Sequence, residues 1–461
     1  MKKLYILTMI LGILSGCADK KETPLFNGKD LNLWQIMGDA EIRDDSTFTL
    51  YGKDTELILE KGSYKNFELA MKLRTVDGGK GEILFHTDKT GQKGYKIAIN
   101  NDLSDPVWWK MTGSLVGVRN LPKSLAKDGE WFLMTVKVEG QKISVLINEE
   151  PVVAYMEPAE PYRLPENSGQ KLSEGAFRIK NTSEQGKLEF AFINVASPDS
   201  VYDTENQLAE AIDEQTDEII RLHQEDFPVL DYHVHLKGGL TKEGAGVQSR
   251  AWGINYALAP NCGIGFPITN DQQVIDYLDS MRSQPFILAM QAEGREWVTT
   301  FSPDVRAEFD YVFTDALTFT DGKGRRTRLW IPEETWIENE QKYMDLIVDR
   351  ICMVLQEPFD IYVNPCFLPS PMNERYDEFW TEERMNKFVS ALAASGKALE
   401  INDRYKIPNQ AIIQKAKDAG VKFSFGTNNG GNDLEKLSYC IAMKKACNIT
   451  AGDMYKPKLK L

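Results

Sequence analysis

The chain has 461 residues, enough for two or three domains, and its composition is that of a globular protein. A formal net charge of −14 argues against a nucleic-acid partner, because phosphate recognition needs concentrated Lys and Arg. The cysteines after Cys17 contain no CxxC pair, so a disulfide framework is not expected.

The N-terminus resembles a bacterial lipoprotein signal peptide over residues 1–16. Lys2 and Lys3 precede an apolar run too short to span a bilayer, and Leu14-Ser15-Gly16-Cys17 is similar to a lipobox. Cleavage before Cys17 leaves that cysteine to carry lipid, with residues 17–23 as a tether. We therefore expect a cell-envelope protein whose partner is the membrane, on the periplasmic or outer-membrane face; an ordinary secretory peptide is the alternative.

Residues 24–196 consist of short alternating apolar runs broken by Gly, Asn, Asp and Pro. Repeated short strands without intervening helices predict an all-β jelly-roll sandwich. The clearest runs are 67–73, 81–86, 95–99, 132–138, 143–147 and 188–193.

The opening of this region, residues 25–34 (LFNGKDLNLW), resembles that of the 3-keto-disaccharide hydrolase (DUF1080) family. Residues 113–117, 129–131 and 146–148 match later landmarks of the family. The resemblance implies a concanavalin-like jelly roll and carbohydrate metabolism. It departs from the family where this chain has His86, Tyr95-Lys96-Ile97 and Asn181-Thr182-Ser183, so we expect the domain to engage carbohydrate while the catalyst lies elsewhere.

Trp108 and Trp109 are the candidate sugar platform of this domain, because aromatic faces pack on the C–H surface of a pyranose. Burial in a core or under a loop is the alternative. Residues 197–226 follow as a linker with helical spacing of Leu208, Ile212, Ile219 and Leu222, in which His223 is expected to be a surface or packing residue.

Residues 227–461 alternate apolar strands with amphipathic helices. The first strand ends at His233-Val234-His235, and six more end near Pro260, Glu293, Thr314, Asn364, Ile401 and Phe425. Serial strand–helix units predict a parallel sheet, and we expect an α/β seven-stranded (β/α) barrel with its site at the carboxyl ends of the strands.

The strand ends are rich in metal-ligand residue types. His233 and His235 face the same way on a strand, and two imidazoles with Glu293 and Asp315 suit one divalent ion, Zn, Mn or Fe. Cys262 is a further candidate ligand. A stripped barrel that only binds its ligand is the alternative.

The strand ends and the segment Glu400-Ile401-Asn402 resemble a PHP (polymerase and histidinol phosphatase) domain. That family implies a ring of histidines, of which only His233 and His235, together with Glu293, stand in place here. The resemblance therefore implies a degenerate metal site.

Two functions follow from these observations. The first is an envelope-anchored, metal-dependent hydrolase or lyase for a glycan-derived, 3-keto sugar, small or oligosaccharide. The second is a non-catalytic glycan-binding lipoprotein made of two degenerate enzyme domains. In the first, Asp231 and Glu400 handle protons. The candidate substrate-binding residues, besides the two tryptophans, are Arg325, Arg326, Arg328, Asn402 and Asn428.

Overall fold

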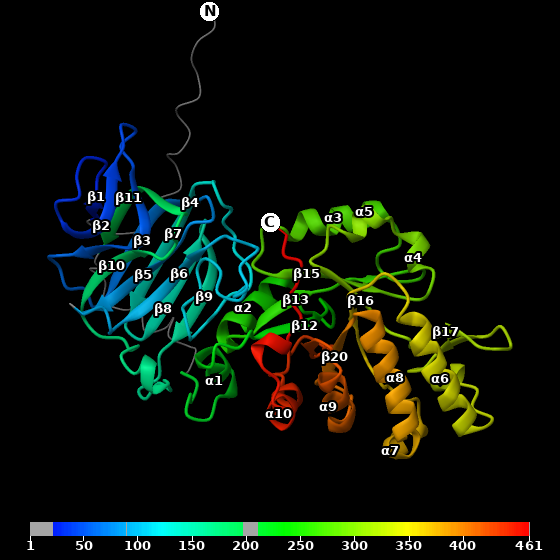
Figure 1. Cartoon of the computed structure of the whole chain (residues 1–461). Helices are drawn as coiled ribbons and strands as arrows, with labels where there is room; N and C mark the ends of the chain where they lie inside the picture. The colour runs from blue at the N-terminus through cyan, green and yellow to red at the C-terminus, as the bar shows by residue number, and fades with distance from the viewer. Residues whose placement is uncertain (1–21, 89, 197–210, 461) are drawn as a thin grey trace, which may run out of the picture.

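The computed structural model describes residues 22–88, 90–196 and 211–460, which form two domains side by side with a short helix between them (Figure 1). The predicted signal peptide and its Cys17 lie outside the described residues. Across the described ranges, we find no helix with both the length and the apolar character that a bilayer crossing needs.

The N-terminal domain is one curled antiparallel sheet with its apolar core inside. Alternation along the strands fixes the two faces: in β4, Leu69, Met71 and Leu73 are buried while Lys72 is exposed. The sheet order is β6-β5-β10-β3-β11-β4-β7-β8-β9, with β1 on β11 and β2 on β3. The strands are β1 (Glu22–Phe26), β2 (Trp34–Ile42), β3 (Phe48–Leu59), β4 (Phe67–Val76), β5 (Lys80–Thr87), β6 (Tyr95–Asn100), β7 (Phe132–Glu139), β8 (Lys142–Ile147), β9 (Glu150–Met156), β10 (Ala176–Asn181) and β11 (Lys187–Ala196).

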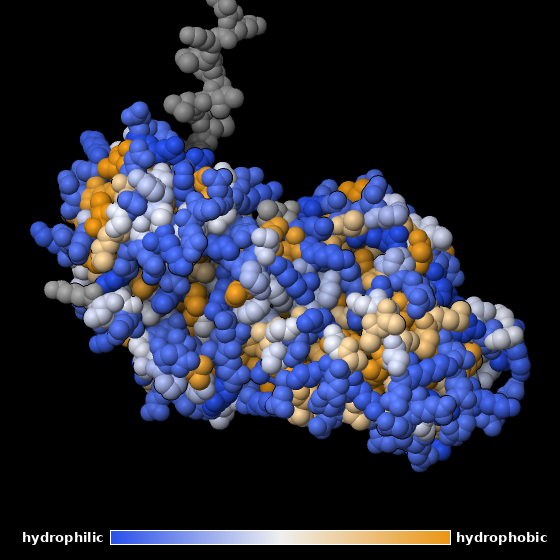
Figure 2. Space-filling model, in the orientation of Figure 1, coloured by the Kyte–Doolittle hydropathy of each residue, from blue (hydrophilic) through white to orange (hydrophobic). Residues whose placement is uncertain are grey.

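The predicted all-β jelly-roll architecture is confirmed as a curled antiparallel sheet, and the six predicted runs lie in β4, β5, β6, β7, β8 and β11. The strand β2 was not predicted because most of it is exposed on both faces, so its sequence does not alternate between apolar and polar residues. Its apolar residues Ile36, Met37 and Ile42 are among those exposed, and apolar side chains gather over the β1–β2 edge in Figure 2.

The C-terminal domain contains a closed parallel barrel. The hydrogen-bonded order is β13-β12-β21-β20-β19-β16-β15, and β13 also pairs with β15, which closes the ring at seven strands. The predicted parallel seven-stranded barrel is therefore confirmed. Its strands are β12 (Leu230–Val234), β13 (Asn255–Leu258), β15 (Ile287–Ala292), β16 (Tyr311–Thr314), β19 (Ile361–Tyr362), β20 (Ala398–Asn402) and β21 (Phe423–Gly426). A two-residue strand, β14 (Asn261–Cys262), also pairs with β15, and a hairpin of β17 (Thr318–Thr320) and β18 (Arg326–Arg328) follows β16.

Helices lie in the connections between these strands (Figure 1). Their starts are set by side-chain caps; in α2, for example, Thr241 accepts the Gly244 N–H, and Gly253 ends the helix in the left-handed region. The helices are α2 (Lys242–Trp252), α3 (Asp271–Met281), α4 (Trp297–Thr300), α5 (Pro303–Arg306), η3 (Pro332–Glu334), α6 (Glu340–Val354), η4 (Met372–Arg375), α7 (Tyr376–Phe379), α8 (Glu382–Ser395), α9 (Gln410–Asp418), α10 (Ser438–Ala446) and η5 (Ala451–Asp453); η1 (Pro165–Asn167) belongs to the first domain.

Helix α1 (Glu218–Gln224) joins the two domains through opposite faces. Ile220 belongs to the apolar core of the first domain, whereas Ile219 and Leu222 belong to that of the barrel. His223 is buried here: its Nδ1 accepts the Asn120 N–H, its Nε2–H donates to the Gly253 carbonyl at 2.7 Å, and burial lowers its pKa to about 3. His223 is thus a packing residue that links the domains.

Candidate functional site

Polar side chains converge inside the barrel toward the carboxyl ends of its strands. We call the set the barrel cluster: Asp231, His233, His235, Gln291, Glu293, Asp315, Asn364 and Glu400. Strand alternation places 231, 233 and 235 of the β12 segment on the inner side together. Because the barrel is closed, the side chains at the ends of its strands lie close together.

Asp231 is the deepest member and is fully buried. Its carboxylate accepts the Thr427 hydroxyl at 2.5 Å and the backbone N–H groups of His233 and Thr427 at 3.0 and 3.1 Å. Burial raises the pKa of Asp231 to about 6, against the opposing effect of these hydrogen bonds. The structure corrects the prediction that Asp231 handles substrate protons, because its carboxylate is enclosed by hydrogen bonds within β12 and to Thr427 and has no exposed surface.

His233 is held between two acceptors. Its Nδ1 lies 2.6 Å from Glu400 Oε1 and its Nε2 lies 3.3 Å from Gln291 Oε1. Both ring nitrogens of His233 are therefore occupied by side chains of the protein. The pair needs Gly426 beside it, since a Cβ there would lie 2.2 Å from Glu400 Oε1 and 2.8 Å from His233 Cβ.

Glu400 is a positioning residue. Besides His233, it accepts the Asn364 N–H at 2.7 Å and the Asn402 side-chain amide at 3.0 Å, and it is 1% exposed. The prediction that Glu400 transfers protons to substrate is therefore corrected: its oxygens are occupied by neighbours that hold the imidazole of His233 in place.

His235 is hydrogen-bonded to the Ala259 carbonyl and to the Gln291 side chain. Its Nδ1–H donates to the Ala259 carbonyl at 2.7 Å, which leaves Nε2 unprotonated in the neutral ring. Burial, with the nearby charges of His233 and Lys237, lowers the pKa of His235 far below its usual value, so the ring is neutral at physiological pH.

Glu293 and Asp315 form a coupled carboxyl pair, which we call the rim pair. Asn261 donates to Glu293 Oε1 at 2.7 Å, while Asn364 donates to Asp315 Oδ2 at 3.0 Å. Burial, together with the charge of Asp315, raises the pKa of Glu293 to about 8, and burial also raises the pKa of Asp315. Both carboxyls therefore bind a proton more readily than they would in water, and the two titrate together.

Asn364 and Gln291 are cluster residues that we did not select from the sequence. Asn364 has a left-handed backbone (φ 46°) and contacts Asp315, Glu400, Asn402 and Asn428 through its side chain or N–H group. For Gln291 the signal was present: it precedes Glu293 by two residues on β15, hence on the same inner face.

Asn402 and Asn428, the predicted substrate-binding amides, are used inside the cluster. Both donate to the Asn364 side-chain oxygen, at 3.2 and 2.9 Å. Asn402 is fully buried, which corrects its predicted role, whereas Asn428 keeps a 9% exposed edge. His235, Glu293 and Asp315 are buried as well, with 4–6% of their surface exposed.

The predicted metal ligands do not fit an ion as they are arranged. Throughout the described ranges, no three His, Cys, Asp or Glu side chains converge closely enough to hold one. The His233 nitrogens face Glu400 and Gln291, and the Cys262 thiol points to the Pro260 carbonyl, with burial raising its pKa far above neutral pH. Cys262 is therefore corrected as a ligand, and we derive no chemical step through a metal.

Of the two predicted sugar-stacking tryptophans, Trp108 is buried and Trp109 is partly buried. Trp108 is 3% exposed and packs in the apolar core of the barrel, and Trp109 donates from its indole to Asp226 at 2.9 Å while packing against the same core. The structure thus corrects the prediction for Trp108, which the domain interface covers, whereas Trp109 keeps part of its surface exposed.

The predicted arginines of the β17–β18 hairpin are held mostly by local acids. Arg325 pairs with Asp321 at 2.7 Å, and Arg328 pairs with Glu334. Arg326 is exposed on β18. The contacts of Arg325 and Arg328 organise the hairpin, which corrects their assignment to substrate.

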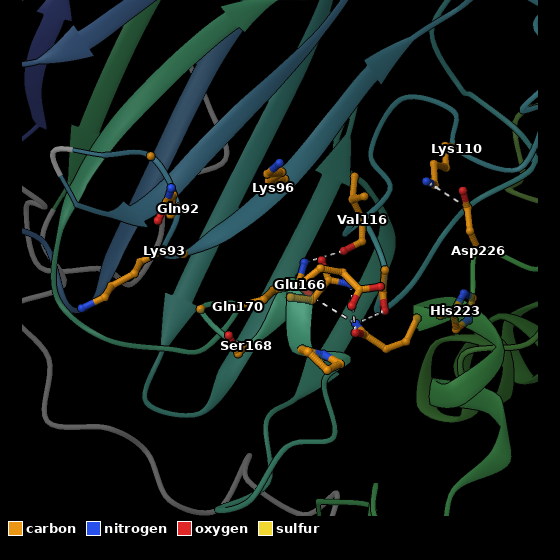
Figure 3. A pocket seen from close by; sticks show the side chains of 17 residues that line it. Gln92, Lys93, Lys96, Lys110, Val116, Glu166, Ser168, Gln170, His223 and Asp226 are labelled. Carbon is orange, nitrogen blue, oxygen red and sulfur yellow. Dashed lines mark hydrogen bonds and ion pairs between the residues drawn. The ribbon is translucent and has the colours of Figure 1, made fainter.

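A second concave site lies in the N-terminal domain beside α1, and we call it the β6 cavity (Figure 3). Its volume is about 670 Å³, within the range of ligand pockets. Lys96 projects from β6, the Lys110–Asp226 ion pair (2.9 Å) lies at the α1 side, and Gln170 donates to the Val116 carbonyl. The lining residues are Gly91, Gln92, Lys93, Gly94, Lys96, Lys110, Val116, Gly117, Pro165, Glu166, Asn167, Ser168, Gly169, Gln170, His223, Gln224 and Asp226.

Comparison with known proteins identifies the N-terminal domain. Residues 21–196 match the 3-keto-alpha-glucoside-1,2-lyase-like domain, so this part of the chain is a 3-keto-disaccharide hydrolase-like domain. No curated protein sequence matches the chain. Its structural neighbours include two candidate glycosyl hydrolases from Parabacteroides distasonis ATCC 8503 (17% and 20% identity, covering 39% and 38% of this chain and 94% and 99% of theirs, TM-scores 0.34 and 0.31). Another is the carbohydrate-binding module CBM66 from Bacillus subtilis (13% identity, 36% and 96% coverage, TM-score 0.26).

Proposed function

We propose that this protein is a hydrolase or lyase for a glycan-derived keto sugar, with acid–base chemistry at the barrel rim and carbohydrate engagement by the N-terminal domain. The observation that carries the proposal is the rim pair. Two neighbouring buried carboxyls with raised pKa values, at the carboxyl ends of barrel strands, are what general acid–base catalysis needs. We infer the keto-sugar substrate from the family that residues 21–196 match.

The chemistry suited to the rim pair is elimination from a 3-keto glucoside. Asp315 removes the C2 proton, which the neighbouring ketone acidifies, and the C–H electrons form the C1–C2 double bond as the C1–O bond breaks. Glu293 gives its proton to the departing oxygen, so the two carboxyls exchange protonation states. Return of the proton from Asp315 to Glu293 resets the pair.

The barrel in this proposal is of the (β/α) PHP type, supported by the His-x-His strand end and the Glu400-Ile401-Asn402 segment on a seven-stranded parallel ring. A bound divalent ion stays a prediction made from the sequence alone. Metal analysis of the purified protein, before and after His233→Ala with His235→Ala, tests it: bound metal that the double variant loses supports the ion.

Single turnover with a 3-keto glucoside, followed by NMR, tests the rim pair. We expect Glu293→Gln and Asp315→Asn each to lower kcat by about 100-fold or more, as loss of a general acid or base does. Glu383→Gln, an exposed carboxylate on α8, is the matched control and retains parent activity. Parent-like turnover by both rim variants excludes this mechanism.

A second candidate is a non-catalytic glycan-binding protein, favoured by the size and polarity of the β6 cavity. In that case an oligosaccharide binds the parent and the Glu293→Gln variant equally, Lys96→Ala weakens binding, and no sugar is turned over. Turnover by the parent that is lost in Glu293→Gln decides for the enzyme.

Envelope anchoring through Cys17 completes the proposal, supported by the sequence Leu14-Ser15-Gly16-Cys17. Full-length protein made in a bacterial host should partition with membranes and carry a lipid mass on its N-terminal peptide. Cys17→Ala should release it to the aqueous fraction; membrane association unchanged by this substitution contradicts the anchor.

A further inference from the structure

Lys123 is a buried cation without a partner. Its side chain belongs to the loop that precedes β7, and the residue is 9% exposed. Among the described residues, none forms a hydrogen bond or an ion pair with its ammonium group. Burying an unpaired ammonium is unfavourable, so this position destabilises the fold unless something complements the charge.

The nearest carboxylate, that of Asp310, is committed elsewhere. Its two oxygens accept the backbone N–H groups of Leu288 and Lys460, at 2.7 and 2.6 Å. Asp310 attracts Lys123 only from beyond ion-pair distance, and burial lowers the pKa of Lys123 despite that attraction. Asp310 therefore does not neutralise the ammonium directly.

Lys123 lines a cavity of about 270 Å³ at the boundary of the two domains, which we call the Lys123 cavity. Lys127 and Asn148 line it from the first domain, and Arg282 and Gln284, from the α3–β15 loop, line it from the barrel. Three cationic side chains and one carboxylate, Glu150, are present among its described lining residues. Its volume exceeds that of several water molecules, at roughly 30 Å³ each.

We propose that the Lys123 cavity is a binding site for a small oxyanion that joins the two domains. The ammonium of Lys123 supplies the buried charge, while Lys127 and the amide of Gln284 supply donors from both sides of the boundary. Arg282, whose guanidinium also pairs with Glu308 at 2.8 Å, adds positive charge to the same lining. Free phosphate and the carboxylate of an acidic sugar share this chemistry. The site is independent of the rim pair and of the proposed reaction.

Calorimetry and thermal unfolding of the full chain test the site, with phosphate or glucuronate compared with chloride at equal ionic strength. We expect one oxyanion to bind per chain and to raise Tm. Lys123→Met should lower the affinity at least 10-fold, and Lys127→Met about threefold. Lys61→Met, which removes an exposed lysine charge, is the control and binds as the parent does.

Stability without the anion separates a binding site from a structural role. In chloride, Lys123→Met should be at least as stable as the parent, because it removes an unpaired buried charge; in saturating phosphate or glucuronate, the parent should be the more stable. Preference for phosphate identifies a free oxyanion, and preference for glucuronate identifies an acidic sugar. If neither anion raises Tm beyond chloride, or if Lys123→Met keeps parent affinity, the proposal is wrong and water fills the cavity.

Discussion

The barrel cluster and the β6 cavity hold similar residue types in opposite environments. In the cluster, the His233–Glu400 pair is at most 1% exposed, and the neighbouring carboxyls of Asp231 and Glu293 have raised pKa values. In the β6 cavity, the Lys110 and Asp226 side chains of the ion pair are 28% and 49% exposed. Charges in the first site are therefore strongly coupled to protein stability, and those in the second are screened by water.

This difference suits the barrel cluster to acid–base chemistry and the β6 cavity to ligand recognition. Burial separates the proton affinities of neighbouring carboxyls, which acid–base catalysis requires, whereas an open polar cavity can exchange water for sugar hydroxyls without reorganising buried charge. Four substitutions test whether the buried groups of the barrel cluster affect stability more than the exposed charges of the β6 cavity.

His233→Ala has the largest expected effect. It leaves the Glu400 carboxylate buried without its His233 partner and opens space beside Phe313, whose ring centroid is 4.6 Å from that of His233. We expect a loss of about 3–5 kcal/mol in the free energy of unfolding, measured by urea denaturation. A loss below about 1 kcal/mol would show that Glu400 needs no charged partner.

Asp231→Asn should stabilise the protein at neutral pH. The pKa of Asp231 is raised from 3.8 to about 6 in the folded protein, so its favourable contribution is complete below pH 4 and is lost as the pH rises through 6. That loss is worth roughly 3 kcal/mol, at about 1.36 kcal/mol per pKa unit. Urea denaturation from pH 3.5 to 8 should show a flatter profile for the variant; identical profiles contradict the raised pKa.

Gly426→Ala tests the close packing around the His233–Glu400 pair. The new Cβ would lie 2.2 Å from Glu400 Oε1, and overpacking of this kind costs about 1–3 kcal/mol. Gly431→Ala is the matched control, since nothing lies within 4 Å of a Cβ at that position. Thermal unfolding should separate the two variants; equal Tm values would place free space beside β21.

Lys110→Ala should have the smallest effect. Its pairing with Asp226 is solvent-screened, so we expect less than about 1 kcal/mol of destabilisation. Urea denaturation in 0.05 and 0.5 M salt measures it, and the difference should shrink at the higher salt. A loss as large as that of His233→Ala would remove the distinction between the two sites.

The periodicity of the sequence predicted the barrel well, because each strand end is marked by a polar residue after a short apolar run. The strands that end at Ala292 and Gly426 finish within a residue of the positions expected near Glu293 and Phe425. His233, His235, Glu293 and Asp315 were identified for the same reason: inward-facing strand residues meet once the ring closes.

The hydrogen-bond partners of these polar residues could not be predicted from the sequence. Nothing in a single sequence shows that Asn364 contacts Asp315 and Glu400 together, or that Gln291 faces the second nitrogen of His233. The tryptophan prediction failed for a related reason. Trp108 lies in the first domain along the chain, yet packs in the apolar core of the second.

Helix α1 has a practical consequence for anyone dividing the gene. Ile220 belongs to the apolar core of the first domain, and Ile219 and Leu222 belong to that of the barrel. A cut between the two domains therefore removes apolar contacts from at least one fragment. Expression of the separate halves should yield insoluble material, so crystallisation and labelling are better done with both domains in one chain.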